Sequence, residues 1–281
     1  MTTMNDSPDS TRSKSHAFWK AHPFGLHYVT DGDLEPGTRP FYDHLRPWMS
    51  PFRFPGRLER IDRYARLLRD RHLLEIGCGL GFETIEYLKR GVRVTATDLT
   101  EPATHLARSH FELEGVKPED IRVEDVLALS FPDGSFDAVS ASGVVHYSGN
   151  TAQAIREIHR VLKPGGWAII HGFYRRPSWM RILTRLAREN IELPDEEAPC
   201  IDCLTEKQIL AMFDGFTIGE VEREHFRAGP IGARRGRIKM LLYERGFVPV
   251  YNLLPRFIAE RLACKLTVTA SRREEALQQE S

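Results

Sequence analysis

The sequence predicts an α/β protein in which a doubly wound parallel sheet carries helices on both faces. Short apolar runs alternate with amphipathic helical patterns from residue 72 to residue 174. Within this region LLEIGCGLG, residues 73–81, leads from an apolar strand through a glycine-rich turn into a helix. Parallel strands need crossover connections of about a dozen residues or more, and the segments between these runs provide that length.

The individual elements follow from their periodicity. Helices are expected at residues 57–70, 82–89, 102–113 and 152–162, where apolar side chains recur at helical spacing. Further along, a helix is expected at residues 179–191 and a capped helix from Thr205. The expected strands are HLLEIG, VRVTATD, IRVED, FDAVSAS, GWAIIHGF, FTIGEVERE and KLTVTAS.

Three regions are expected along the chain. Residues 1–15 are polar and predict a disordered tail, and residues 16–56 are rich in aromatic residues and proline and predict an N-terminal cap. Residues 57–281 form the main domain, in which 175–204 and 227–257 are insertions expected to cover the substrate site.

Composition restricts the possible partners. Lysine plus arginine equal aspartate plus glutamate at 39 each, so net charge provides no field for holding a nucleic acid. No apolar run approaches the roughly 20 residues of a membrane-spanning helix, and the first residues lack the apolar stretch of a secretory signal. We therefore expect a cytoplasmic protein with a small-molecule partner, no nucleic acid and no membrane span.

A metal site is not expected. Cys200 and Cys203 are spaced CxxC, but a second paired motif that would complete four zinc ligands is absent from the sequence.

The glycine-rich turn predicts a cofactor site. Glycines let the backbone approach a ligand, and the helix that follows presents N–H groups to electronegative atoms. Asp98 ends the next strand, where a carboxylate can accept hydrogen bonds from both hydroxyls of a ribose. The turn has the spacing GxGxG with Glu75 two positions before Gly77, whereas the dinucleotide fingerprint is GxGxxG.

Three later segments of the sequence bear on which cofactor the turn binds. They are VEDV at residues 123–126, SFPDGSFDAVSASGVVHY at 130–147 and EIHRVLKPGG at 157–166. In register and order, these segments and the turn resemble class I S-adenosylmethionine-dependent methyltransferases over residues 72–174. FWKAHPFG at 18–25 and LPRF at 254–257 resemble a bacterial, type 11-like small-molecule subgroup. The resemblance implies a Rossmann-like sheet of seven strands, with KLTVTAS as an antiparallel last strand near the sheet edge.

The resemblance also implies roles for residues in binding S-adenosylmethionine, whose product is S-adenosylhomocysteine. The turn would hold the methionine half, Asp98 the ribose, Leu99 the adenine face, and Asp125 with the Val126 backbone the adenine amino edge. Ser142 and Gly143 would line the methionine end, and Phe18, Trp19 and His27 would close the site. The implied cofactor set is Glu75, Gly77, Cys78, Gly79, Gly81, Asp98, Leu99, Asp125, Val126, Ser142 and Gly143.

A general base is needed only when the acceptor carries a proton. His146 and Tyr147 follow the fourth strand and His171 lies in the fifth, and these three residues are the catalytic candidates. Each could instead satisfy a hydrogen bond in a loop.

Two other functions remain open at this point. A nicotinamide-dependent oxidoreductase would share the strand, the turn and the acidic ribose ligand, but not LKPGG or FPDGSFD. A non-catalytic protein that binds S-adenosylmethionine would share the whole cofactor site. DNA methylation is disfavoured, because the fourth strand ends in SASGVVHY without the DPPY-like or ProCys motif of those enzymes.

Overall fold

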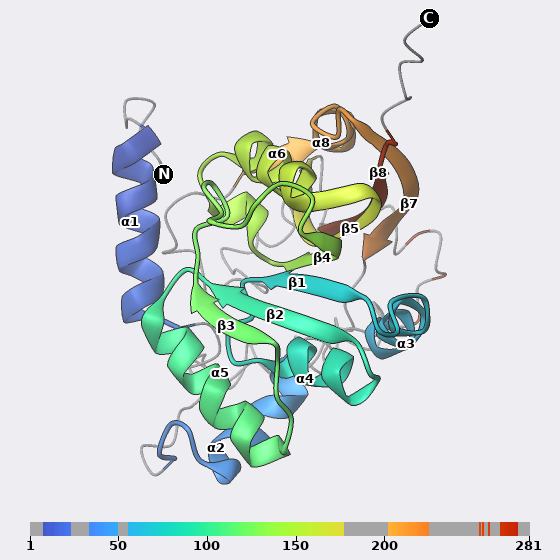
Figure 1. Ribbon diagram of the computed structural model, residues 1–281. Helices are drawn as coiled ribbons and strands as arrows, with labels where there is room; N and C mark the ends of the chain where they lie inside the picture. The colour runs from blue at the N-terminus through green and yellow to red at the C-terminus, as the bar shows by residue number, and fades with distance from the viewer. Residues whose placement is uncertain are drawn as a thin grey trace, which may run out of the picture.

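The computed structural model describes residues 8–23, 34–49, 56–176, 202–224 and 265–274, together with positions 253, 255 and 258. Its centre is one mixed β-sheet flanked by helices (Figure 1). The strands are β1 His72–Ile76, β2 Arg93–Asp98, β3 Asp120–Val123, β4 Phe136–Ser142, β5 Leu162–Arg176, β6 Cys203–Thr205, β7 Phe216–Glu224 and β8 Lys265–Arg272. The helices are α1 Pro8–Ala21, α2 Arg39–Leu45, η2 Arg46–Trp48, α3 Arg57–Leu67, α4 Phe82–Lys89, α5 Glu101–Glu114, η3 Val145–Tyr147, α6 Thr151–Val161 and α8 Glu206–Leu210.

The sheet has the order β3-β2-β1-β4-β5-β8-β7, which confirms the doubly wound prediction. Strands β1 to β5 run parallel, whereas β8 lies between β5 and β7 and is antiparallel to both. The implied reversal of the last strand is therefore also confirmed. Strand order changes direction between β1 and β4, and ligands of such sheets bind beyond the carboxyl ends of the strands at that point.

Both faces of the central strands are buried. Leu74 and Ile76 of β1 belong to one apolar cluster with Ile155 and Ile158 of α6. Leu73, which points to the opposite face, belongs to a second cluster that includes residues of α3 and α4. Helix α6 is fixed at its start by Asn150, whose side chain accepts a hydrogen bond from Gln153 N. Burial on both faces explains why Leu73, Leu74 and Ile76 are all apolar although their side chains alternate between the two faces.

Two elements correct the expectations from the sequence. Helix α1 begins at Pro8, whereas we expected a disordered tail over residues 1–15; its contacts with the rest of the protein involve Ser15, Phe18 and Trp19, which a polar composition does not reveal. Strand β6 was not expected, and it pairs in parallel with β5. The expected helix at 179–191 and most of the insertions at 175–204 and 227–257 lie outside the described residues.

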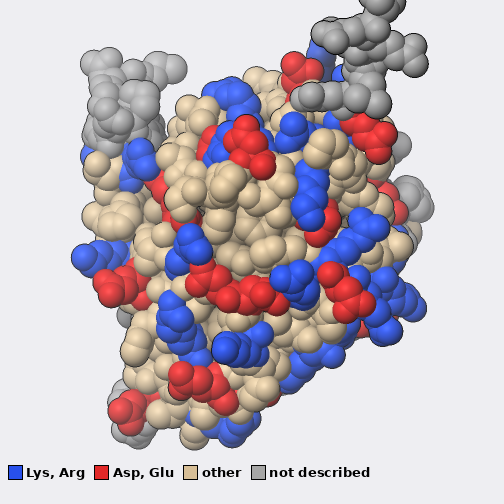
Figure 2. Space-filling model, viewed as in Figure 1, with Lys and Arg blue, Asp and Glu red and all other residues tan. Residues whose placement is uncertain are grey.

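Charges of both signs are interspersed over the face shown in Figure 2. In the described part of the chain, ion pairs such as Arg93 with Glu119 and Lys163 with Asp137 bring charges of opposite sign together. Opposite charges at this separation cancel each other's field within a short distance. Among the described residues, no helix combines the length and apolar character that crossing a membrane requires.

Candidate cofactor and active site

The turn after β1 is built on three glycines in the left-handed region. Gly77, Gly79 and Gly81 have φ values of 72°, 53° and 80°. A Cβ on Gly77 would lie 2.2 Å from Val144 Cγ2, and one on Gly81 would lie 2.4 Å from Phe111 Cε1. A Cβ on Gly79 would meet nothing within 4 Å. Two of the glycines are therefore required by packing, whereas the third borders open space.

Asp98 joins this turn to the end of β2. One of its carboxylate oxygens accepts a hydrogen bond from Gly79 N at 3.0 Å, and the other accepts one from Thr100 N at 3.1 Å. Burial raises the pKa of Asp98, and the hydrogen bonds from the two backbone N–H groups oppose that rise. The oxygen bonded to Thr100 N also accepts a hydrogen bond from Thr100 Oγ1 at 3.3 Å. The oxygen bonded to Gly79 N has a second lone pair, so it can still accept a hydrogen bond from a ribose hydroxyl. Leu99, the next residue, is half-buried.

Beneath the turn lies a buried polar cluster that the sequence did not reveal in full. Thr84 Oγ1 donates to Glu75 Oε2 at 2.6 Å. Arg57, at the start of α3, forms an ion pair with Glu83 at 2.9 Å and donates to Ser142 Oγ at 2.5 Å. Burial, followed by the neighbouring Glu83 carboxylate, raises the pKa of Glu75 to about 8. The pattern of α3 gave no signal for Arg57, because arginines recur along the whole helix.

The candidate adenine edge lies after β3. Asp125 accepts a hydrogen bond from Leu127 N at 2.8 Å, and its other oxygen forms an ion pair with Arg12 of α1 at 2.5 Å. Val126 is buried. Helix α1 runs beside this end of the sheet in Figure 1, and it is anchored there by Ser15, whose hydroxyl donates to Tyr147 O at 3.0 Å. The sequence did not predict this contact between Arg12 and Asp125.

The ends of β4 and β5 carry the remaining candidates. Ser142 and His171 are register partners, and Gly143 N donates to His171 O at 3.0 Å. A Cβ added to Gly172 would lie 3.9 Å from His146 Cε1, so His146 borders the same strand ends. Its ring centroid lies 4.2 Å from that of Tyr147. The structure therefore brings these candidates together, whereas His27 lies outside the described residues.

Both candidate histidines are buried and neutral. Burial lowers the pKa of His146 to about 3, assisted by the charge of Lys265. Burial also lowers the pKa of His171 well below its ordinary value, and its Nδ1 lies 3.1 Å from Thr267 Oγ1. A neutral imidazole can accept a hydrogen bond or a proton. Its weak basicity favours orienting an acceptor group over removing a proton from it completely.

These histidines predict sensitivity to acid. The pKa of His110 is also lowered by burial, to about 4, whereas an unfolded histidine titrates near 6.5. Below pH 6.5 the unfolded chain therefore binds more protons than the folded chain, and the free energy of unfolding falls as the pH falls towards 4 and 3. Glu75 and Asp98, whose pKa values are raised, have the opposite effect, because their folded forms bind protons more readily than the unfolded chain does. The three histidines outnumber them, so thermal melting between pH 7.5 and pH 4.5 should show a decreasing Tm. His110→Gln should reduce that slope and His105→Ala, an exposed control, should not; a flat profile would contradict the prediction.

Cys203 lies in β6 and packs against Tyr147, whereas Cys200 lies outside the described residues. Within the described part of the chain, no group of three or more His, Cys, Asp or Glu residues is arranged to hold a metal ion.

The parallel sheet, its reversed final strand and a glycine turn facing an acidic residue define a Rossmann-like protein that binds a nucleoside cofactor. Residues 74–170 match the family model described as a methyltransferase domain. The ubiquinone biosynthesis O-methyltransferase of Chromobacterium violaceum is 36% identical over 116 residues, which are 40% of this chain and 48% of that protein. The chloroplastic 2-methyl-6-phytyl-1,4-hydroquinone methyltransferase 2 of Oryza sativa is 30% identical over 173 residues, 62% of this chain and 45% of that protein.

Solved structures agree on the fold. A chain from the complex between the Trm112 methyltransferase activator and a methyltransferase of Haloferax volcanii matches with a TM-score of 0.58 at 15% identity, covering 84% of this chain and 97% of that one. The YcgJ protein of Bacillus subtilis matches with a TM-score of 0.53 at 18% identity, covering 78% and 98%. The match over residues 74–170 supports the resemblance to class I S-adenosylmethionine-dependent methyltransferases that the sequence motifs indicate. The alignments span about half the length of the curated relatives.

The cofactor of this family is S-adenosylmethionine. The residues present are compatible with it, because Gly79 borders open space beside the turn and the Asp98 carboxylate is hydrogen-bonded to that turn.

Proposed function

We propose that this protein transfers the methyl group of S-adenosylmethionine to an oxygen, nitrogen or carbon atom of a small-molecule acceptor and releases S-adenosylhomocysteine. The observation that carries the proposal is the open space at Gly79 beside the Asp98 carboxylate, at the point where the strand order reverses. The curated relatives act on quinone precursors by name, which supports a small organic acceptor. A cytoplasmic location is part of the proposal and rests on composition.

The protein itself would have to align the two reactants and exclude water from the site. When bound, the cofactor supplies a methyl carbon that its sulfonium already activates, so no elaborate acid–base system is needed. Glu75 and the turn would hold the methionine half and Asp98 the ribose. His146 would orient the acceptor. Trp19, whose ring lies 5.3 Å from that of Tyr147 in an edge-to-face contact, would cover the acceptor side from α1.

Calorimetric titration of the full chain tests the cofactor. We expect S-adenosylmethionine and S-adenosylhomocysteine to bind and NAD not to bind. Binding of NAD without a response to the other two would instead indicate the oxidoreductase. Release of S-adenosylhomocysteine during turnover of any acceptor separates an enzyme from a protein that only binds the cofactor.

Asp98→Ala should weaken cofactor binding by about 1–3 kcal/mol, because charge-assisted hydrogen bonds to the ribose are lost. The dissociation constant, measured by calorimetry, reports the change. Asp120→Ala removes an exposed carboxylate of β3 that pairs with Arg122 and serves as the matched control. An unchanged constant in Asp98→Ala would show that Asp98 does not bind the ribose.

His146→Ala should lower kcat more than it lowers cofactor affinity, because the imidazole would orient the acceptor. Since burial lowers the pKa of His146 to about 3, activity should show no loss from its protonation as the pH falls through 6.5. Steady-state rates across pH, together with the dissociation constant, measure both effects. Wild-type rates in the variant would remove His146 from the mechanism.

A further inference from the structure

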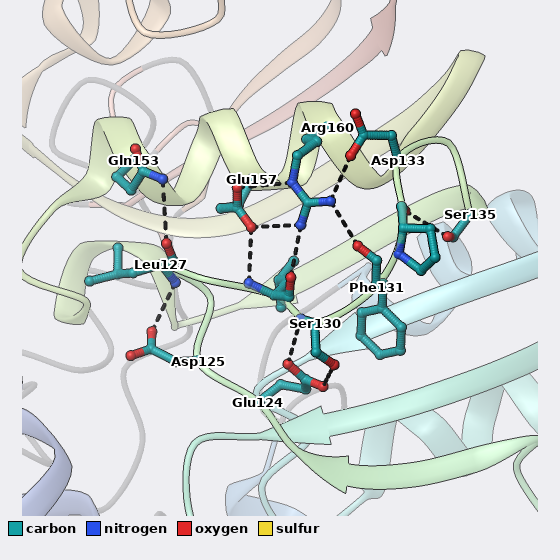
Figure 3. Close-up of polar contacts among 12 residues, drawn as sticks. Glu124, Asp125, Leu127, Ser130, Phe131, Asp133, Ser135, Gln153, Glu157 and Arg160 are labelled. Atoms are coloured by element: carbon teal, nitrogen blue, oxygen red, sulfur yellow. Dashed lines mark hydrogen bonds and ion pairs between the residues drawn. The ribbon is translucent and has the colours of Figure 1, made fainter.

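The loop between β3 and β4, residues 124–135, carries the candidate adenine contacts but contains no helix or strand. Its backbone therefore needs hydrogen-bond partners outside itself. Helix α6 supplies them from one stripe of its surface (Figure 3). Gln153, Glu157 and Arg160 follow each other at helical spacing and all point toward the loop.

The stripe formed by Gln153, Glu157 and Arg160 contacts every second residue of the loop. Gln153 Nε2 donates to Leu127 O at 3.3 Å, and Glu157 accepts from Leu129 N at 2.9 Å. Arg160 donates to Leu129 O at 2.8 Å and to Phe131 O at 2.7 Å. Successive turns of α6 thus bind the backbone at positions 127, 129 and 131. These contacts fix how far the β3–β4 loop lies from α6 and which loop residue lies opposite each turn of the helix.

Ion pairs hold the Arg160 side chain in place while it donates hydrogen bonds to the loop carbonyls. Its guanidinium contacts Glu157 at 2.8 and 3.0 Å and the Asp133 carboxylate at 2.8 Å. These two carboxylates raise the pKa of Arg160, so it stays charged. A planar fork with five donors can bridge two carbonyls and two carboxylates, whereas a lysine ammonium cannot reproduce that geometry.

The hydrogen bonds between α6 and the loop are linked through Leu127 to Asp125, the candidate adenine contact. Leu127, whose carbonyl is bonded to Gln153, donates its own N–H to the Asp125 carboxylate. At the other side of the loop, Ser130 N donates to Glu124 Oε2 at 2.9 Å, which closes the segment around Asp125. A shift of the loop backbone between positions 127 and 130 would therefore act on Asp125, whose other carboxylate oxygen is paired with Arg12 of α1.

We infer that Arg160, with Glu157 and Gln153, positions the β3–β4 loop so that the protein distinguishes adenine from other bases in its cofactor. This inference rests on the proposed function, since it assigns Asp125 to the adenine amino group. Arg160 is a positioning residue, because it acts on the cofactor only through the loop.

The test compares two nucleosides that differ at the amino edge of the base. S-adenosylhomocysteine and S-inosylhomocysteine are titrated into the wild-type protein and into Arg160→Ala and Arg160→Lys. The wild type should prefer the adenosyl compound. In Arg160→Ala its affinity for that compound should fall about tenfold, whereas affinity for the inosyl compound should change less than twofold. Arg160→Lys should restore little of the preference, and Arg93→Ala, an exposed ion-paired control on β2, should retain all of it.

A purely structural role for Arg160 would weaken both ligands by the same factor and leave their ratio unchanged, which would overturn the inference. A wild-type protein that binds both compounds equally would overturn it as well. Failure of the wild type to bind either compound would refute the proposed function itself, so the two failures are distinguishable. If Arg160→Ala does not fold, Gln153→Ala keeps the contacts of Arg160 with the loop, although it removes the hydrogen bonds that Arg156 donates to Gln153 Oε1. This variant should lower the ratio in the same direction, and an unchanged ratio there would count against the inference.

Discussion

Replacing Arg57 with alanine is expected to lower the free energy of unfolding by about 3–5 kcal/mol, the range for removing one partner of a buried ion pair. The side chains of Arg57 and Glu83 are only 3% and 6% exposed. The variant leaves the Glu83 carboxylate in a low-dielectric interior without the cation that faces it, close to Glu75. Urea denaturation followed by circular dichroism measures the change.

Two controls make this expectation specific. Arg63→Ala breaks an exposed ion pair with Glu220 and should cost no more than about 1 kcal/mol. The double variant Arg57→Met with Glu83→Leu removes both charges and should recover most of the loss, because apolar groups of similar size replace the pair. A single variant as stable as the wild type would show that the pair contributes nothing.

Gly79→Ala should weaken S-adenosylmethionine binding on the order of a hundredfold while leaving a folded protein, which corresponds to about 2.7 kcal/mol. The new methyl group meets no protein atom within 4 Å, so the space it enters is the space proposed for the cofactor. Calorimetry of the variant reports the loss. The φ of 53° adds a backbone strain that must be separated from this effect.

Gly91→Ala is the control for that strain. Gly91 lies in the turn between α4 and β2 with a φ of 79°, and a Cβ there also meets nothing within 4 Å. Both variants should lose similar stability, but only Gly79→Ala should lose cofactor affinity. Equal affinity in the two variants would mean that the cofactor lies elsewhere.

The predictions from sequence succeeded where a local pattern determines the structure. The strand that becomes β1 is mostly apolar because both of its faces are buried, and Gly77 and Gly81 after it are required by close contacts. Asp98 could be placed because it is the last residue of β2 and the ends of neighbouring parallel strands meet. Each of these statements needs only a few adjacent residues.

The contacts that were missed join residues far apart in the chain. Arg12 reaches Asp125, and Arg57 reaches Ser142, across spans that no periodicity covers. Strand β6 has three residues, which is too short for an alternating pattern to stand out. Arg160 looked like one more polar residue on a helix, because its partners are backbone carbonyls of a loop and carry no signal in the sequence.

The position of β8 determines the order in which the sheet can be assembled as the ribosome makes the chain. β8 is synthesised after β7 yet lies between β7 and β5, so β7 cannot join the sheet before residues 265–272 exist. The five parallel strands, with the glycine turn and Asp98, precede both. Until β8 arrives, β5 has an open edge along the face that β8 later covers, and such edges can pair with other chains. The nascent protein is therefore most exposed to aggregation after its cofactor half is made and before its last strand is inserted.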